Sequence, residues 1–107
     1  MARHFPKSDA IRKKLNEIES EMKRLGIWSK TPLPKDAFLD MGAFGMNTMS
    51  FDQWLQFVFV PNVRKLLKTD GPWPDKSEIG TIAVREFDGM PESDGLIALL
   101  TEFDHLF

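Results

Sequence analysis

The sequence predicts an all-α protein: a compact bundle of about four helices forming a single domain over residues 1–107. Three observations support this prediction. Apolar residues recur at helical spacing in the first, middle and last parts of the chain, no segment alternates like a strand for more than a few residues, and proline or glycine separates the helical stretches. At this length the chain can bury about two-thirds of its unfolded surface, enough for a core.

The first predicted helix runs from about Ser8 to Leu25. Ser8 is a candidate N-cap, and Gly26 stands where a left-handed residue would end the helix. Glu19 and Lys23 form a favourable i,i+4 pair on the face opposite the apolar stripe. The stripe, spaced by four and three residues in turn, consists of Ile11, Leu15, Ile18, Met22 and Leu25.

Residues 27–48 are predicted to form a long ordered loop. Pro32 and Pro34 interrupt any helix because each lacks an amide donor and restricts the residue before it. The segment is too apolar to be a solvated linker, so we expect it to lie across the bundle. Its large apolar side chains are Ile27, Trp28, Leu33, Phe38, Leu39, Met41, Phe44 and Met46.

The central helix is predicted over Ser50 to Thr69, with Ser50 and Gln53 spaced as a capping box. Its apolar residues occupy more than one side, as expected for a helix with several neighbours. Pro61 removes one backbone hydrogen bond and presses on the carbonyl of Phe57, so a kink or break is expected near Val60.

Two shorter helices follow the turn at Pro72-Trp73-Pro74. One is predicted from about Lys76 to Asp88, although Gly80 lowers its helix propensity by roughly 1 kcal/mol relative to alanine. Pro91 is suited to be the first residue of the last helix. The stripe of this last helix is Leu96, Leu100, Phe103 and Phe107.

Composition excludes several classes of function. The chain has no cysteine, so disulfides, thiolate catalysis and cysteine-based metal sites are excluded. The longest apolar run, Phe57 to Val60, is far shorter than the ~20 residues that span a bilayer, and the first residues lack the apolar run of a signal peptide. We therefore expect a cytoplasmic protein with no membrane association.

Charge is distributed unevenly along the chain. Residues 1–35 carry nine Lys or Arg and four Asp or Glu, whereas residues 36–107 carry five and twelve. The first third could contact phosphates as a basic arm, a basic first helix could pack beside acidic later ones, or both charged faces could simply be solvated. The net charge of −2 argues against nucleic acid as the main ligand.

No residue pattern indicates catalysis, a metal or a cofactor, and we predict none. His4 and His105 lie near opposite termini, and neither has a second histidine at metal-ligand spacing. Phosphate-binding glycine loops, nucleophile elbows and zinc-protease motifs are all absent from the sequence.

The aromatic content is the strongest functional signal. Nine Phe, three Trp and six Met exceed what a small core needs, unless the proline-containing loop covers them. An exposed remainder would suit a protein partner. The candidate partner-binding surface consists of Phe44, Met46, Phe57 and Trp73.

The stretch from Phe44 to Pro61, FGMNTMSFDQWLQFVFVP, resembles the signature of the YqcC-like family of small bacterial proteins. The resemblance continues through the turn at 71–74 and the last helix, and so covers nearly the whole chain. It departs at Asn47, where family members often have aspartate. It implies a helical bundle, and members are often called tRNA pseudouridine synthase C or described as encoded beside such an enzyme.

Two functional hypotheses follow from these observations, with a third beside them. Pseudouridine synthases use a catalytic aspartate in an Arg-Leu-Asp motif on a larger α/β scaffold. The nearest match in this sequence is Arg85-Glu86-Phe87-Asp88. The sequence therefore favours a non-catalytic accessory or interaction module, with a tRNA-modification enzyme as the suspected partner. The alternatives are pseudouridine synthase activity itself and RNA binding through the basic first third.

Overall fold

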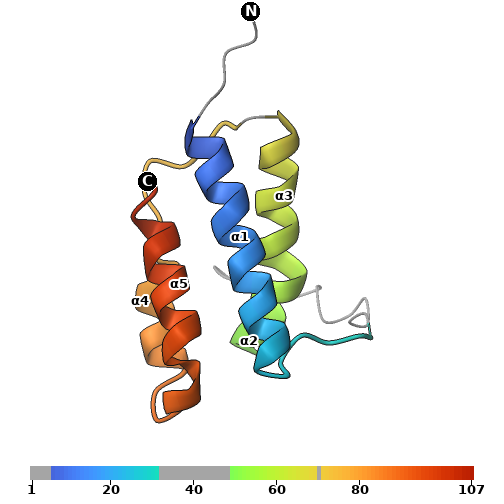
Figure 1. Ribbon diagram of the computed structural model, residues 1–107, viewed down its shortest axis with the longest axis vertical. Helices are drawn as coiled ribbons and strands as arrows, with labels where there is room; N and C mark the ends of the chain where they lie inside the picture. The colour runs from blue at the N-terminus through green and yellow to red at the C-terminus, as the bar shows by residue number, and fades with distance from the viewer. Residues whose placement is uncertain (1–5, 32–48, 70) are drawn as a thin grey trace, which may run out of the picture.

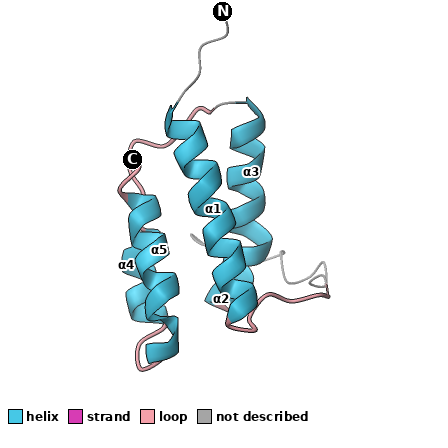
Figure 2. Cartoon of the chain, viewed as in Figure 1, coloured by secondary structure: helices cyan, strands magenta, loops and turns pink. Residues whose placement is uncertain are grey.

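The computed structural model describes residues 6–31, 49–69 and 71–107, and every regular element within them is helical. Helix α1 lies between α3 and α5, and α4 packs beside α5 (Figures 1 and 2). This confirms the all-α prediction. The elements in chain order are α1 (Pro6–Arg24), α2 (Phe51–Trp54), the π-helical turn η2 (Leu55–Phe59), α3 (Val60–Thr69), α4 (Ile79–Glu86), the 3₁₀ turn η3 (Pro91–Ser93) and α5 (Asp94–Asp104).

Helix α1 buries the predicted stripe. Its residues Ile11, Leu15, Ile18 and Met22 are all fully buried. The expected N-cap at Ser8 is wrong: the helix begins at Pro6, so Ser8 lies in its first turn. Proline favours that opening position because its missing amide donor would have no helical partner there.

The end of α1 is the predicted glycine stop. Gly26 has φ +76°, in the left-handed region. The Ile27 N–H donates to the Met22 carbonyl at 3.1 Å, and the Gly26 N–H donates to the Lys23 carbonyl at 3.1 Å. These two bonds form the Schellman arrangement that closes a helix.

We call the continuous stretch of α2, η2 and α3 the aromatic helix. Its start is the predicted capping box, in which the Ser50 N–H donates to Gln53 Oε1 at 2.8 Å and the Gln53 N–H donates to Ser50 Oγ at 3.4 Å. The expected interruption at Pro61 takes the form of a wider turn. The Val60 N–H reaches back five residues to the Leu55 carbonyl, and the helix then continues to Thr69. This turn widens the backbone directly before the proline ring.

Helix α4 is shorter than predicted because α5 determines where it begins. Its own N-cap residue makes no side-chain cap. Instead, the carboxylate of Asp104 accepts from the Ile79 N–H at 2.9 Å and from the Gly80 N–H at 2.7 Å. A Cβ on Gly80 would lie 2.4 Å from Thr101 Oγ1 and 2.8 Å from Thr101 Cα. Glycine is therefore needed for this close approach of α4 and α5.

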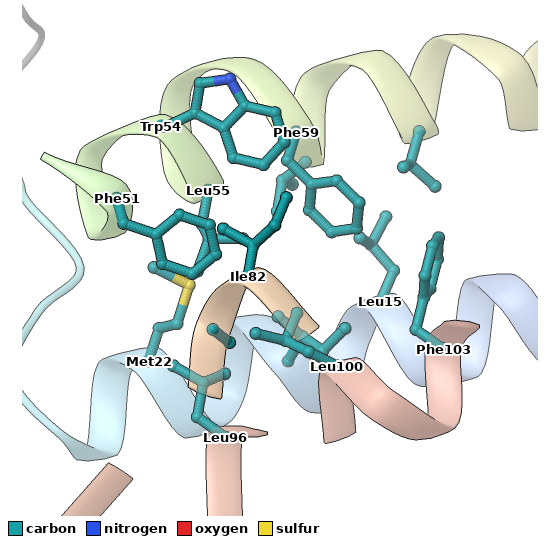
Figure 3. Close-up of a cluster of buried hydrophobic side chains, with 14 of the residues drawn as sticks. Leu15, Met22, Phe51, Trp54, Leu55, Phe59, Ile82, Leu96, Leu100 and Phe103 are labelled. Atoms are coloured by element: carbon teal, nitrogen blue, oxygen red, sulfur yellow. The ribbon is translucent and has the colours of Figure 1, made fainter. Parts of the chain in front are cut away.

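The last helix also differs slightly from the prediction at its start. Pro91 opens the 3₁₀ turn, and the α-helix proper begins at Asp94. From there Leu96, Leu100 and Phe103 face the core. The close-up in Figure 3 shows how side chains of the aromatic helix, α1, α4 and α5 fill this core together.

Most of the predicted proline-containing loop, at residues 32–48, lies outside the described residues, as does His4. None of the helices in the described part of the chain is long and apolar enough to cross a membrane.

Candidate functional site: an aromatic groove

A groove of about 310 Å³ opens beside the aromatic helix. The aromatic helix forms one wall, residues 73–79 form the other, and the C-terminal end of α5 contributes the rest. Its surface is dominated by aromatic side chains from all three segments. They are Trp54, Phe59, Trp73, Phe103 and Phe107.

The five rings form one continuous chain of contacts. The ring centroids of Trp54 and Phe59 are 5.8 Å apart, and those of Phe59 and Phe103 are 5.1 Å apart in an edge-to-face arrangement. Phe107 then links Phe103 at 5.2 Å to Trp73 at 6.2 Å. Such pairs contribute about 0.5–1.5 kcal/mol each beyond their buried area. The groove is therefore built on packed rings rather than on single side chains.

The rings differ in burial from one end of this chain to the other. Trp54, Phe59 and Phe103 are only 9%, 7% and 3% exposed. Trp73 and Phe107, by contrast, are half-buried and pack against the edge of the core. The last two rings therefore present the accessible aromatic surface.

Few polar groups line the groove. Asn62 is exposed on α3, and Lys76 and Glu78 form an exposed ion pair of 3.7 Å. Ser77 donates its hydroxyl to Asp104 Oδ1 at 2.6 Å, so it supports the cap of α4. The chemistry that this arrangement offers is apolar contact with a few orienting polar groups. Within the described residues, no cluster of His, Asp and Glu could hold a metal ion.

The structure describes two of the four predicted partner-binding residues, Trp73 and Phe57. Trp73 lines the groove. Phe57 is half-buried on η2 and is not among the groove residues. Phe44 and Met46 lie outside the described residues.

The sequence prediction missed the other groove residues. Trp54, Phe59, Phe103 and Phe107 all belong to helical apolar stripes, so spacing assigned them to the core. Most of the surface of each ring is indeed buried against the core. Only the meeting of three distant segments shows that their remaining edges border a hollow.

Gln56 is a second residue whose role the sequence did not reveal. This buried side chain on η2 accepts from the Ser29 N–H at 2.7 Å and donates to the Ser29 carbonyl at 2.7 Å. Both bonds go to the backbone of the same residue, Ser29, so the Gln56 amide holds the segment after α1 against the π-helical turn η2. This contact gives both the oxygen and the nitrogen of the buried amide a hydrogen-bond partner.

Most basic residues of α1 are paired with carboxylates. Lys23 Nζ lies 2.9 Å from Glu19, which also bonds Arg64 of α3. Burial raises the pKa of Glu19, but hydrogen bonds from Lys23 and Arg64 outweigh it and hold the pKa below its usual value. Lys14 Nζ lies 2.5 Å from Glu102 of α5, and this bond raises the pKa of the lysine.

Two further basic residues of α1 are paired within the helix. Arg12 pairs with Asp9 at 3.2 Å, and Arg24 pairs with Glu21. Arg12, Lys23 and Arg24 thus pair with carboxylates of α1 itself, whereas Lys14 pairs with Glu102 of the later helix α5.

The fold and groove define a small all-α protein with an aromatic groove. Residues 10–106 match the protein family described as tRNA pseudouridine synthase C, and the chain belongs to this family. This confirms the resemblance seen in the sequence.

Two relatives are similar to the chain. A protein of Haemophilus influenzae named only as uncharacterized is 32% identical over 81 residues, 73% of this chain and 76% of that protein. A protein of Pectobacterium carotovorum subsp. carotovorum named tRNA pseudouridine synthase C is 30% identical over 64 residues. That alignment covers 60% of this chain but only 17% of the Pectobacterium protein. No solved structure matches the chain.

Proposed function

We propose that the chain is a non-catalytic, cytoplasmic accessory module that binds a tRNA-modification enzyme through its aromatic groove. The observation that carries this proposal is the groove itself, with Trp73 and Phe107 half-buried at its accessible end. Aromatic residues that present rigid apolar area beside a packed core are the typical anchors of protein interfaces. The occupant we propose is an apolar side chain on the surface of the enzyme.

The Pectobacterium relative supports the choice of partner. A segment similar to this chain makes up 17% of a longer protein that carries the synthase name. A covalent link keeps two parts of one chain together at an effective concentration near the millimolar range. The same association between two separate chains would require a binding surface, and we propose that the aromatic groove supplies it.

Two observations bear on the alternatives. The polar groups of the groove are an amide, a hydroxyl bonded to Asp104, and an exposed Lys76–Glu78 pair. This set offers no isolated acid or base aimed into the hollow, which favours binding over catalysis. The pairing of α1 cations with carboxylates, as at Lys14 and Glu102, weighs against RNA binding through this helix.

Binding can be tested by titrating the chain with a tRNA pseudouridine synthase encoded in the same genome, using calorimetry. We expect Trp73→Ala to weaken the complex at least about fivefold, because an aromatic anchor at an interface contributes more than about 1 kcal/mol. The matched control is Trp28→Ala, since Trp28 is also half-buried but lies outside the groove. Circular dichroism checks that both variants fold. No binding by the wild-type chain, or equal loss in both variants, would refute the proposal.

The enzymatic alternative has its own test. The pure chain is incubated with unmodified tRNA, and pseudouridine is mapped afterwards. We expect none to form. Pseudouridine formation that disappears in Asp88→Asn, the residue closest to a synthase motif in this sequence, would overturn the non-catalytic proposal.

A further inference from the structure

The tip of the α4–α5 hairpin, within residues 84–97, is a second surface that combines exposed apolar and acidic side chains. Val84 and Met90 are 57% and 40% exposed, and they are the exposed large apolar side chains of the described residues. Both line a hollow of about 390 Å³ together with Phe87, Pro91 and Ile97. The tip ends the hairpin on the side away from the C-terminus (Figure 1), whereas the aromatic groove includes the C-terminal Phe107.

Carboxylates surround this apolar hollow. Asp88 and Asp94 belong to its lining, and Glu86 and Glu92 are exposed on the same turn. Arg85 is an exposed basic residue beside Val84, but from Glu86 to the end of the chain the sequence contains six acidic residues and no Lys or Arg. No ion pair joins these four carboxylates to another described residue, in contrast to the paired carboxylates of α1.

We infer that the hairpin tip is a docking surface for a lysine- or arginine-bearing segment of the partner protein. Lys and Arg side chains combine an aliphatic stem with a charged head. The stem matches the exposed faces of Val84 and Met90, and the head reaches the carboxylates of Asp88 and Asp94 that line the same hollow. Methionine adds adaptability because its unbranched side chain fits irregular partners.

Charge complementarity identifies the partner more closely. An enzyme that acts on tRNA must present positive surface to the phosphate backbone. The acidic tip complements such a surface, and it would steer the approach of the two proteins. The inference thus rests on the proposed function and deepens it: the groove supplies an apolar anchor, and the tip supplies an electrostatic contact at the other end of α5.

The salt dependence of binding separates the tip from the groove. The chain is titrated with the same-genome pseudouridine synthase at low and high sodium chloride. We expect Asp88→Asn/Asp94→Asn to weaken binding at least about fivefold at low salt and to flatten the salt dependence, because screening removes the charge contribution in the wild type as well. The matched control is Asp9→Asn/Glu17→Gln on α1, which changes the net charge equally and should leave binding unchanged.

A second variant tests the apolar half of the surface. Val84→Ser/Met90→Ser should weaken binding at low and high salt alike, because loss of apolar contact is not screened. Both side chains are exposed, so this variant should fold normally.

The possible outcomes are distinguishable. If Trp73→Ala weakens binding but both tip variants bind like the wild type at every salt concentration, the inference is wrong and the proposed function stands. If the wild-type chain does not bind the synthase, both fail. If the wild-type chain instead self-associates and the tip variants abolish this, a second copy is the occupant and the inference is overturned.

Discussion

Helix α5 contacts two neighbours in opposite ways. Against α4 it makes a backbone contact, because Gly80 leaves no side chain between the helix and Thr101. Against the aromatic helix it makes a ring contact, in which Phe103 meets Phe59 at a centroid separation of 5.1 Å. Flat rings meeting edge to face leave space at their margins. The groove beside the aromatic helix is therefore lined by rings, whereas the hollow at the tip of the seam between α4 and α5 is lined by Val84, Met90 and carboxylates.

The α4–α5 seam and the packing of the aromatic helix also differ in the interactions that stabilise them. The seam between α4 and α5 depends on specific atoms: the missing Cβ of Gly80 and the carboxylate of Asp104. The aromatic helix is held by buried area, by one amide clamp and by an ion pair to α1. We therefore expect single changes to be most damaging at the seam, and three predictions test this order.

The largest effect is expected for Gly80→Ala. The new Cβ would meet Thr101 Cα at 2.8 Å and Thr101 N at 2.9 Å, so backbone must move. Overpacking of this kind costs about 1–3 kcal/mol, and we expect the upper part of that range in urea unfolding. The control is Gly95→Ala, where the Cβ meets only the flexible end of Glu21 at 2.9 Å. Alanine's higher helix propensity should offset that contact. Equal destabilisation by Gly80→Ala and Gly95→Ala would contradict the prediction that the backbone contact at Gly80 makes the seam the more sensitive region.

The next effect is expected for Gln56→Ala in the aromatic helix. The change removes both hydrogen bonds to Ser29 and leaves a part-buried peptide group without its partner. Such loss costs about 1–3 kcal/mol. Gln53→Ala is the matched control, since Gln53 bonds the exposed Ser50 N–H, which water can satisfy after the change. Urea unfolding should show the larger loss for Gln56, and the reverse order would mean that the clamp contributes little.

Local features of this fold could be predicted from the sequence. The α1 stripe, the glycine stop at Gly26 and the capping box at Ser50 each depend on residues within one or two helical turns. The role of Gly80 could not be predicted, because its partner Asp104 is 24 residues away in the chain. The same holds for Gln56 and Ser29, which are 27 residues apart.

The residues of the candidate site likewise divide into those that the sequence could predict and those that it could not. Trp73 could be selected because it stands in a turn between two prolines, where no helix stripe would bury it. The rings of Phe59 and Phe103 could not, because helical periodicity reports which face is apolar but not whether neighbours cover it completely. Trp73 lines the groove, but all four residues, Phe44, Met46, Phe57 and Trp73, stay predictions as partner-binding residues.

The smallest effect is expected at the ion pair between α1 and α3, and its dependence on pH makes it measurable. Glu19 is bonded by Lys23 at 2.9 Å and by Arg64. Burial alone would raise its pKa, but these two hydrogen bonds lower it below its usual 4.5 in the folded protein. The folded state therefore binds the proton less readily than the unfolded state. The contact stabilises the protein above the unfolded-state pKa, and this stabilisation is lost as pH falls through the lowered folded pKa.

A double-mutant cycle isolates this contribution. Glu19→Gln, Arg64→Gln and the double variant are unfolded with urea at neutral pH and near pH 3. We expect a coupling of about 0.5–1 kcal/mol at neutral pH, because the pair is partly exposed, and a smaller coupling in acid. A coupling that stays constant would show that Arg64 packs by its stem rather than by its charge. A coupling larger than the destabilisation caused by Gly80→Ala would reverse the order proposed for the α4–α5 seam and the aromatic helix.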